Sequence, residues 1–177
     1  MTAPAYASLK EPIRLIRGAL TVAERTTPRF AKVRTSRLSP AQANGVRYEN
    51  KVHRALAVLG KSLDATVERN PWFKFVDANG VGACSPDAIL WLDPGFALVV
   101  EVKYTWVPGA SVKLKGLYGP VINCALRPHI LRTLVICKTL VPDAPEPISG
   151  ICDGTASTAT ASQAPVYHWL GQGPLVW

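Results

Sequence analysis

The sequence predicts an α/β fold of the α+β kind, in which a mixed central β-sheet is flanked by helices. Three features predict this class: a helix-start signal before residue 40, strand-like runs between residues 71 and 106, and a second helical pattern followed by an apolar strand before residue 140. Helices and strands in this order must pack as layers around one core. With 48% hydrophobic and 18% charged residues, the 177-residue chain has a globular composition and suits one domain.

The first helix is predicted from Ser39 to about Leu59. Ser39 is a preferred N-cap residue, Pro40 suits the first helical position, and Gln42 completes a capping box. Gly60 follows the last apolar position and is expected to end the helix. A long helix therefore precedes the strands.

Three strands are then predicted to form a meander. They cover Pro71–Asp77, Gly82–Leu92 and Phe96–Trp106. Asn79-Gly80 has the turn chemistry of a hairpin, and Asp-Pro-Gly at 93–95 supplies the next tight turn.

The second half of the chain contains fewer elements. A helix is predicted at Ser111–Ala125, although the Gly-Pro pair at 119–120 must kink or interrupt it. The apolar run Leu131–Leu140 predicts a buried strand. Residues 142–173 are rich in Pro, Ser, Thr, Ala and Gly and predict loop, with a short edge strand at Val166–Leu170.

These patterns divide the chain into an arm and a domain. Residues 1–38 are expected to form a basic N-terminal arm with a short amphipathic helix at Glu11–Val22. Residues 39–177 are expected to form the domain, with a core at about 40–140 and a loop-rich extension at 141–177.

Positive charge is concentrated in the first third of the chain. The net charge is +8, and residues 1–54 hold eleven Lys or Arg against three acids, which accounts for all of it. This asymmetry favours nucleic acid as the partner, with an anionic membrane surface second and a merely solubilising charge as the plain alternative. The candidate phosphate contacts here are Arg29, Lys32, Arg34, Arg37, Arg47 and Lys51.

The cysteines indicate a reducing compartment. Cys84, Cys124, Cys137 and Cys152 lack CxxC spacing, so we expect reduced thiols instead of a zinc site or a disulfide framework. A cytoplasmic location is therefore expected. Because no run of about 18 apolar residues exists, no membrane partner is expected. The oligomeric state stays open and is compatible with a homodimer.

Two charges interrupt the apolar run of the third predicted strand. Glu101 and Lys103 are two residues apart, so they project from the same face of a sheet. If residues 93–95 form the loop, Asp87 lies opposite Glu101, with Cβ atoms about 4.5 to 5.5 Å apart. Two carboxylates at that distance repel unless a cation lies between them, and hard oxygen ligands select Mg²⁺ or Mn²⁺. The alternative, an exposed salt bridge on a strand pair, fits the apolar flanks poorly.

Glu49 is a further candidate ligand, from the first helix. It precedes Val52 and Leu56 by three and seven residues, which places it on the buried stripe of the helix, where a charge needs a partner. Alternatively, Glu49 complements the positive end of the helix dipole, but that effect is weak so far from the first turn.

These residues carry a family resemblance. Pro86-Asp87, thirteen intervening residues and then Glu101-Val102-Lys103 resemble the motif of the PD-(D/E)xK nuclease superfamily. An acidic residue on the preceding helix, as at position 49, is also found in many members.

The resemblance covers roughly residues 40–140 and implies a restriction-endonuclease-like core of helix, three-strand meander, helix and strand. It also implies hydrolysis of phosphodiester bonds with one or two bound metal ions. The implied metal ligands are Asp87, Glu101, Glu49 and the carbonyl of Val102. Lys103 would serve the attacking water.

Exonuclease-like members often carry a Gln and, four residues later, a Tyr on the next helix. In this chain Leu114 stands in place of the Gln and Tyr118 in place of the Tyr, with Lys113 and Lys115 alongside. The departure leaves exonuclease, junction resolvase and phage-type endonuclease open. Lys113, Lys115 and Tyr118 become further candidate nucleic-acid contacts.

The sequence therefore predicts a nuclease that depends on Mg²⁺ or Mn²⁺ and acts on nucleic acid, with DNA favoured. Attack within a strand or from its end stays open. The alternative is a nucleic-acid-binding or virion-associated structural protein that keeps a nuclease fold without cleaving. If the chain is encoded by a phage, its place is the host cytoplasm or the virion.

Overall fold

A computed structural model describes residues 14–27, 38–147 and 164–175 of the chain. In chain order its elements are β1 (Val22–Thr26), α1 (Pro40–Ser62), β2 (Thr66–Arg69), β3 (Trp72–Asp77), β4 (Gly80–Cys84), β5 (Ala88–Asp93), β6 (Phe96–Thr105), α2 (Pro108–Lys113), the π-helical turn η1 (Leu114–Tyr118), α3 (Gly119–Leu126), β7 (Ile130–Thr139) and β8 (Val166–His168). The strands form a three-stranded sheet, β1-β3-β4, and a five-stranded sheet, β2-β5-β6-β7-β8, in which β6, β7 and β8 run parallel. The predicted α+β class with a mixed sheet and flanking helices is confirmed at this level.

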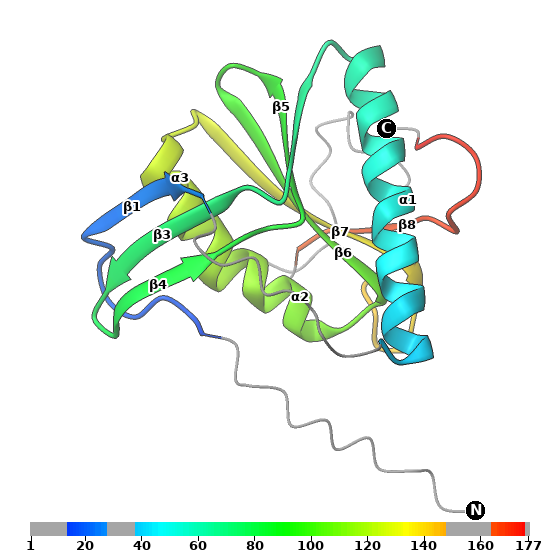
Figure 1. The fold of residues 1–177 in the computed structure, drawn as a ribbon, viewed down its shortest axis with the longest axis horizontal. Coiled ribbons are helices and arrows are strands. Elements are labelled where there is room, and N and C mark those ends of the chain that lie inside the picture. Colours follow the sequence, from blue (N-terminus) through cyan, green and yellow to red (C-terminus); the bar gives the residue numbers. More distant parts are fainter. Residues whose placement is uncertain (1–13, 28–37, 148–163, 176–177) are drawn as a thin grey trace, which may run out of the picture.

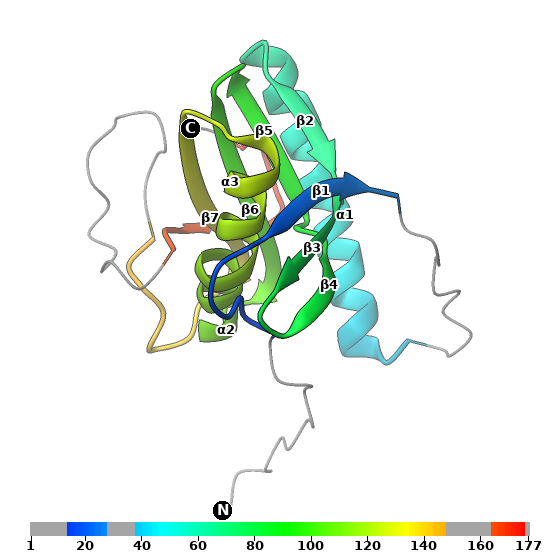
Figure 2. The same cartoon turned by 90° about the vertical axis from the view of Figure 1, so that its left-hand side faces the viewer.

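Helices cover both faces of the five-stranded sheet (Figures 1 and 2). Because side chains alternate along a strand, Val100 and Val102 of β6 pack with α1, whereas Ala97 and Val99 pack with α2, η1 and α3. Glu101 is two residues from Val99 on β6, so its side chain points to the same face of the sheet, the one covered by α2, η1 and α3.

Helix α1 begins as the sequence predicts. The Ser39 side chain accepts a hydrogen bond from the Gln42 N–H, and the Gln42 side chain accepts one from the Ser39 N–H. The end of the helix differs, because α1 continues past Gly60 to Ser62. A Cβ at Gly60 would come within 2.5 Å of the Val67 side chain, so this glycine allows β2 to approach the helix and does not end it.

Strands β2 to β5 form one long hairpin that is broken in the middle. Arg69 pairs with Ala88 and Phe73 with Cys84, so a single register continues across the break and places Pro71 opposite Pro86. Neither proline has a backbone N–H, so the ladder cannot continue there. The prediction of one strand at Gly82–Leu92 and of a three-strand meander in one sheet was therefore wrong. The two halves of the hairpin belong to different sheets.

The predicted pairing of the strands around residue 95 is confirmed from Ala88 to Trp91, which face Val100 and Ala97 respectively. The turn itself differs from the prediction. Asp93 pairs with Phe96, and an irregularity between Trp91 and Asp93 absorbs the extra residue.

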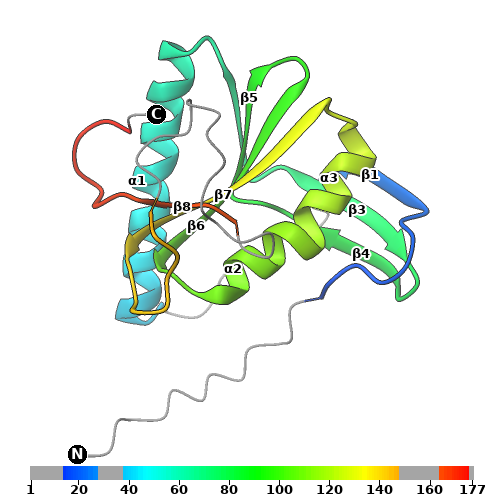
Figure 3. The same ribbon diagram turned by 180° about the vertical axis from the view of Figure 1, so that it is seen from behind.

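The helical run from Pro108 to Leu126 contains the predicted disturbance around Pro120, and it takes the form of the π-helical turn η1 (Figure 3). The N–H of Gly119 donates to the Leu114 carbonyl, five residues back. Pro120 has no N–H to donate to the Gly116 carbonyl, and the N–H of Ile16 donates to it instead, at 3.0 Å. The N-terminal segment thus completes the helix.

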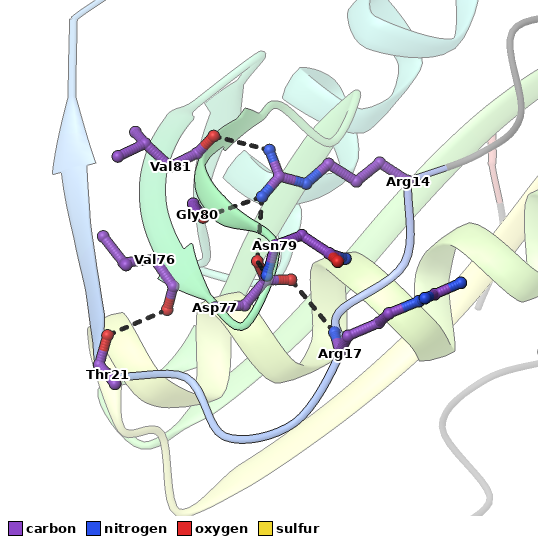
Figure 4. A network of polar contacts seen from close by, with 8 residues as sticks. All are labelled: Arg14, Arg17, Thr21, Val76, Asp77, Asn79, Gly80 and Val81. Atoms are coloured by element: carbon purple, nitrogen blue, oxygen red, sulfur yellow. Dashed lines mark hydrogen bonds and ion pairs between the residues drawn. The ribbon is translucent and has the colours of Figure 1, made fainter.

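Residues 14–21 are irregular and lead into β1, so the predicted helix at Glu11–Val22 was wrong for its described part. β1 pairs antiparallel with β3. Arg14 donates to the carbonyls of Val81 and Gly80 and to Asp77, at 2.7 to 3.0 Å (Figure 4). These partners are distant in sequence, and their contacts override the helical spacing of the apolar residues.

The C-terminal half follows the prediction more closely. The predicted strands at Leu131–Leu140 and Val166–Leu170 correspond to β7 and β8. The described cysteines Cys84, Cys124 and Cys137 are free thiols. Within the described ranges, no helix combines the length and the apolar character needed to cross a bilayer.

Candidate active site

Asp87 lies where the broken hairpin changes sheets. Its backbone carbonyl accepts from the Asn70 N–H at 3.0 Å, and its side-chain Oδ2 accepts from the Val102 N–H at 2.6 Å. Since Ala88 faces Val100, the next pair in this register is Asp87 and Glu101, as the sequence predicts. The break at Pro86 frees Asp87 from the regular ladder and lets its carboxylate reach the neighbouring strand.

Glu101 is fully buried and carries two lysines on one oxygen. Its Oε1 lies 2.5 Å from the Lys103 Nζ and 3.3 Å from the Lys113 Nζ. Its Oε2 is buried and has no hydrogen-bond partner among the described residues. A buried carboxylate oxygen without a partner is costly in an apolar interior, so Oε2 is suited to receive a further cation or donor.

Lys103 joins two of the candidate ligand atoms. Its Nζ is 2.5 Å from Glu101 Oε1 and 3.2 Å from the Val102 carbonyl oxygen. Burial lowers the pKa of Lys103, but the charges of Glu101 and Asp87, the hydrogen bond to Glu101 and the charge of Glu49 together raise it above its usual range. Lys103 is therefore held as an ammonium ion.

The pKa of the Asp87 carboxyl group is raised, so this group ionises less readily than an ordinary aspartate. Burial and the nearby charge of Glu101 raise its pKa to about 7, against the opposing effects of Lys103 and the Val102 N–H. Two carboxyl groups that share a site in this way bind protons or cations more readily than isolated ones.

Glu49 lies within electrostatic reach of the site. It is half-buried on α1, and its charge raises the pKa of both Asp87 and Lys103. The three predicted carboxylate ligands are not drawn into one close cluster, because no three His, Cys, Asp or Glu side chains among the described residues form a group of metal-binding size.

The residues nevertheless fit a hard cation at two points. The unpartnered Glu101 Oε2 offers a free anionic ligand, and Val102 O and Glu101 Oε1 already converge on the Lys103 ammonium. Carboxylate and carbonyl oxygens are the ligands that Mg²⁺ and Mn²⁺ prefer.

The predicted nucleic-acid contacts divide into four groups. Lys113 and Lys115 are half-buried on the helical run, and Lys113 turns towards Glu101. The Tyr118 ring packs beneath the Lys113 ammonium and is only 1% exposed. The predicted nucleic-acid contact at Tyr118 was therefore wrong, because the side chain does not reach the surface. Arg47 and Lys51 are exposed on α1. The remaining four, Arg29, Lys32, Arg34 and Arg37, lie outside the described residues.

Sequence reasoning missed Arg54 and Arg69. Together with Arg47, Asn50 and Lys51 they line a cavity of about 440 Å³. The spacing of Arg47, Lys51 and Arg54 on one helix face was visible in the sequence, but Arg69 joins them only through the fold.

Comparisons with known proteins add no family. No protein-family model, no curated protein sequence and no solved structure matches the chain significantly.

Proposed function

We propose that the protein is a metal-dependent nuclease that hydrolyses phosphodiester bonds of nucleic acid, with DNA as the favoured substrate. The observation that carries the proposal is the meeting of Asp87 and Glu101 on neighbouring strands, with Lys103 beside them and Glu101 Oε2 unpartnered. A carboxyl group with a raised pKa, beside a buried carboxylate oxygen that lacks a partner, is typical of a functional site.

The proposed ligands of Mg²⁺ or Mn²⁺ are Asp87, Glu101, the Val102 carbonyl and Glu49. A bound divalent ion supplies two things at such a site: a lower pKa for its water and neutralisation of charge on the phosphate. The order of α1, the strands, the α2–α3 run and β7 supports a restriction-endonuclease-like core of the PD-(D/E)xK kind, with the first strands divided between two sheets.

Lys103 is proposed to act as a cation. In the metal-free protein burial lowers its pKa, but the charges of Glu101 and Asp87 raise it, and the net shift favours the ammonium form. Its N–H groups can orient the attacking water through its oxygen and can stabilise the charge that develops on the phosphate. Lys113, which donates to the same Glu101 oxygen, adds a second positive charge from the helical run.

Location and assembly follow the proposed function. We expect the protein to act in the cytoplasm, or in the host cytoplasm or virion if a phage encodes it. A homodimer would suit cleavage of both strands of a duplex.

A second function is favoured by one observation. Lys103 and Lys113 already neutralise Glu101 without a metal ion, as in a site that serves only stability. The protein would then be a nucleic-acid-binding or virion-associated structural protein that keeps the fold and does not cleave.

A cleavage panel separates the two functions. Labelled single-stranded, duplex and branched DNA and RNA are incubated with Mg²⁺, Mn²⁺, Ca²⁺ or EDTA. We expect cleavage in Mg²⁺ or Mn²⁺, none with Asp87→Asn, and binding retained by both proteins in Ca²⁺. Asp64→Asn is the matched control, because Asp64 is exposed and has φ of 52°, a conformation that Asn tolerates.

If the wild-type protein binds these nucleic acids but cleaves none of them in any metal, the nuclease proposal fails and the binding protein remains. Equal cleavage by wild type and Asp87→Asn would also overturn the proposed site.

A further inference from the structure

An open surface cavity of about 440 Å³ is lined by Arg47, Asn50, Lys51 and Arg54 of α1 and by Arg69 of β2. Four of these five residues are cations and none is an acid. Arg47 and Lys51 are four residues apart and Lys51 and Arg54 three apart, so they are neighbours on one helix face, where like charges destabilise a helix. An anion in the cavity would attract each of these cations and so offset their mutual repulsion.

The positions of these cations are not explained by ion pairs within the described part of the chain. The ion pairs there use Arg14, Arg25, Lys103 and Lys113, none of which lines the cavity. Arg69 is fixed in place by a neutral partner, because its Nη2 donates to Asn50 Oδ1 at 2.5 Å. The charge of its guanidinium is therefore left for a ligand.

The cavity and the candidate active site use neighbouring residues of the same two regions of the fold. Asn50 follows Glu49 on α1, and Arg69 of β2 pairs with Ala88, the residue after Asp87. His53, buried on α1, lies within interaction range of both Arg69 and the Asp87 backbone carbonyl. A ligand in the cavity would thus contact Asn50, next to Glu49 in the sequence, and Arg69, whose strand partner Ala88 follows Asp87.

We propose that this cavity binds a phosphate group of the nucleic acid, one that is not cleaved, and so positions the neighbouring phosphodiester bond at Asp87 and Glu101. The inference rests on the proposed function. Several N–H donors from arginine and lysine match the oxygens of a phosphate, and such contacts fix the register of a nucleic acid without reading its bases.

The test measures binding in Ca²⁺, without cleavage. The affinity for a labelled DNA is determined by fluorescence anisotropy over a series of salt concentrations for wild type, Arg54→Gln, Arg69→Gln and Lys61→Gln. All three variants lose one positive charge. Lys61 is the control, because it is exposed in the last turn of the same helix and does not line the cavity.

For Arg54→Gln and for Arg69→Gln we expect the slope of log affinity against log salt to fall by about 1, and the affinity at about 0.1 M salt to fall on the order of tenfold. Lys61→Gln should behave as wild type. If all three variants lose affinity equally, or if none does, the cavity does not bind a phosphate of the nucleic acid. Circular dichroism and Tm confirm that each variant is folded.

A second arm separates a polynucleotide phosphate from a free one. The Tm is measured with inorganic phosphate against chloride at equal ionic strength. Stabilisation by phosphate in wild type, together with unchanged DNA salt slopes in both arginine variants, would assign the cavity to a small phosphate compound and overturn the proposal. Because none of these readouts needs cleavage, a protein that binds DNA through the cavity and never cleaves refutes only the proposed function.

Discussion

Two aspartates of the same hairpin, the buried Asp77 and the half-buried Asp87, have opposite environments. Asp77 accepts from Arg14 and the Asn79 N–H on one oxygen and from the Arg17 N–H on the other, at 2.9 to 3.1 Å. Burial alone would raise the pKa of Asp77, but these hydrogen bonds and the charge of Arg14 hold it below its usual range. Asp87 has one backbone donor in this structure and a pKa raised to about 7.

The difference separates a carboxylate that stabilises the fold from one that is prepared for chemistry. At Asp77 every oxygen has a donor, so ionisation is favoured and the charge fastens the N-terminal segment to the β3–β4 turn. At Asp87 ionisation is resisted, and one oxygen of the neighbouring Glu101 has no donor among the described residues. Such a site gains stability when a cation arrives.

The largest effect should come from removing the ammonium at the site. Lys103→Met keeps the length of the side chain and loses the charge, and we expect cleavage to fall on the order of 10²- to 10³-fold, as for the loss of one strong electrostatic contact in other active sites. Lys113→Met should cost less, because its Nζ is 3.3 Å from Glu101 instead of 2.5 Å. Single-turnover cleavage rates test this order, and equal losses in both variants would contradict it.

The comparison predicts opposite stability changes for two similar substitutions. Asp87→Asn removes a carboxyl that the folded state keeps protonated up to about pH 7, whereas its ordinary pKa is 3.8. Wild-type stability therefore falls as pH rises from about 4 to 7, and Asn has no such proton to lose. In EDTA at pH 8 the variant should gain up to about 4 kcal/mol in free energy of unfolding, and the gain should vanish near pH 4.

Asp77→Asn should do the reverse. The lowered pKa of Asp77 contributes stability that is present above its ordinary pKa of 3.8 and is lost as pH falls through the folded value. The variant should be less stable than wild type at pH 8 and should approach it in acid. Urea unfolding of both variants at several pH values provides the measurement. A loss of stability in Asp87→Asn at pH 8 would show that Asp87 is also a structural carboxylate.

A smaller effect is expected at Glu49, whose charge affects the pKa of Asp87 and of Lys103 less than the charge of Glu101 does. Glu49→Gln should lower the cleavage rate about 10- to 100-fold, the range for residues that support metal ligands. Glu24→Gln, an exposed acid on β1, is the control and should cleave as wild type. Cleavage by Glu49→Gln at the wild-type rate would remove Glu49 from the site.

Local signals predicted part of this arrangement well. The capping box at Ser39 placed the start of α1, and the period of two along β6 placed Glu101 and Lys103 on one face. The short turn after Asp93 was enough to predict the register to Asp87, because a hairpin brings adjacent residues together.

These local signals could not predict the contacts between residues that are distant in the sequence. Pro71 and Pro86 break the hairpin only because the register places them opposite each other. The irregular course of residues 14–21 depends on Asp77 and on the carbonyl of Gly116, which are far away in the sequence. Lys113 reaches Glu101 because the helical run packs across the sheet, and no spacing in the sequence shows this.

The central claim is that Glu101 and Asp87 bind a divalent cation, and Mn²⁺ titration measures it most directly. Binding is followed by electron paramagnetic resonance or calorimetry at pH 8 for wild type, Glu101→Gln and Asp77→Asn, each shown to be folded. We expect Mn²⁺ to bind wild type and Asp77→Asn alike and to be lost from Glu101→Gln. Unchanged Mn²⁺ binding by Glu101→Gln, or none by the wild-type protein, would contradict the claim.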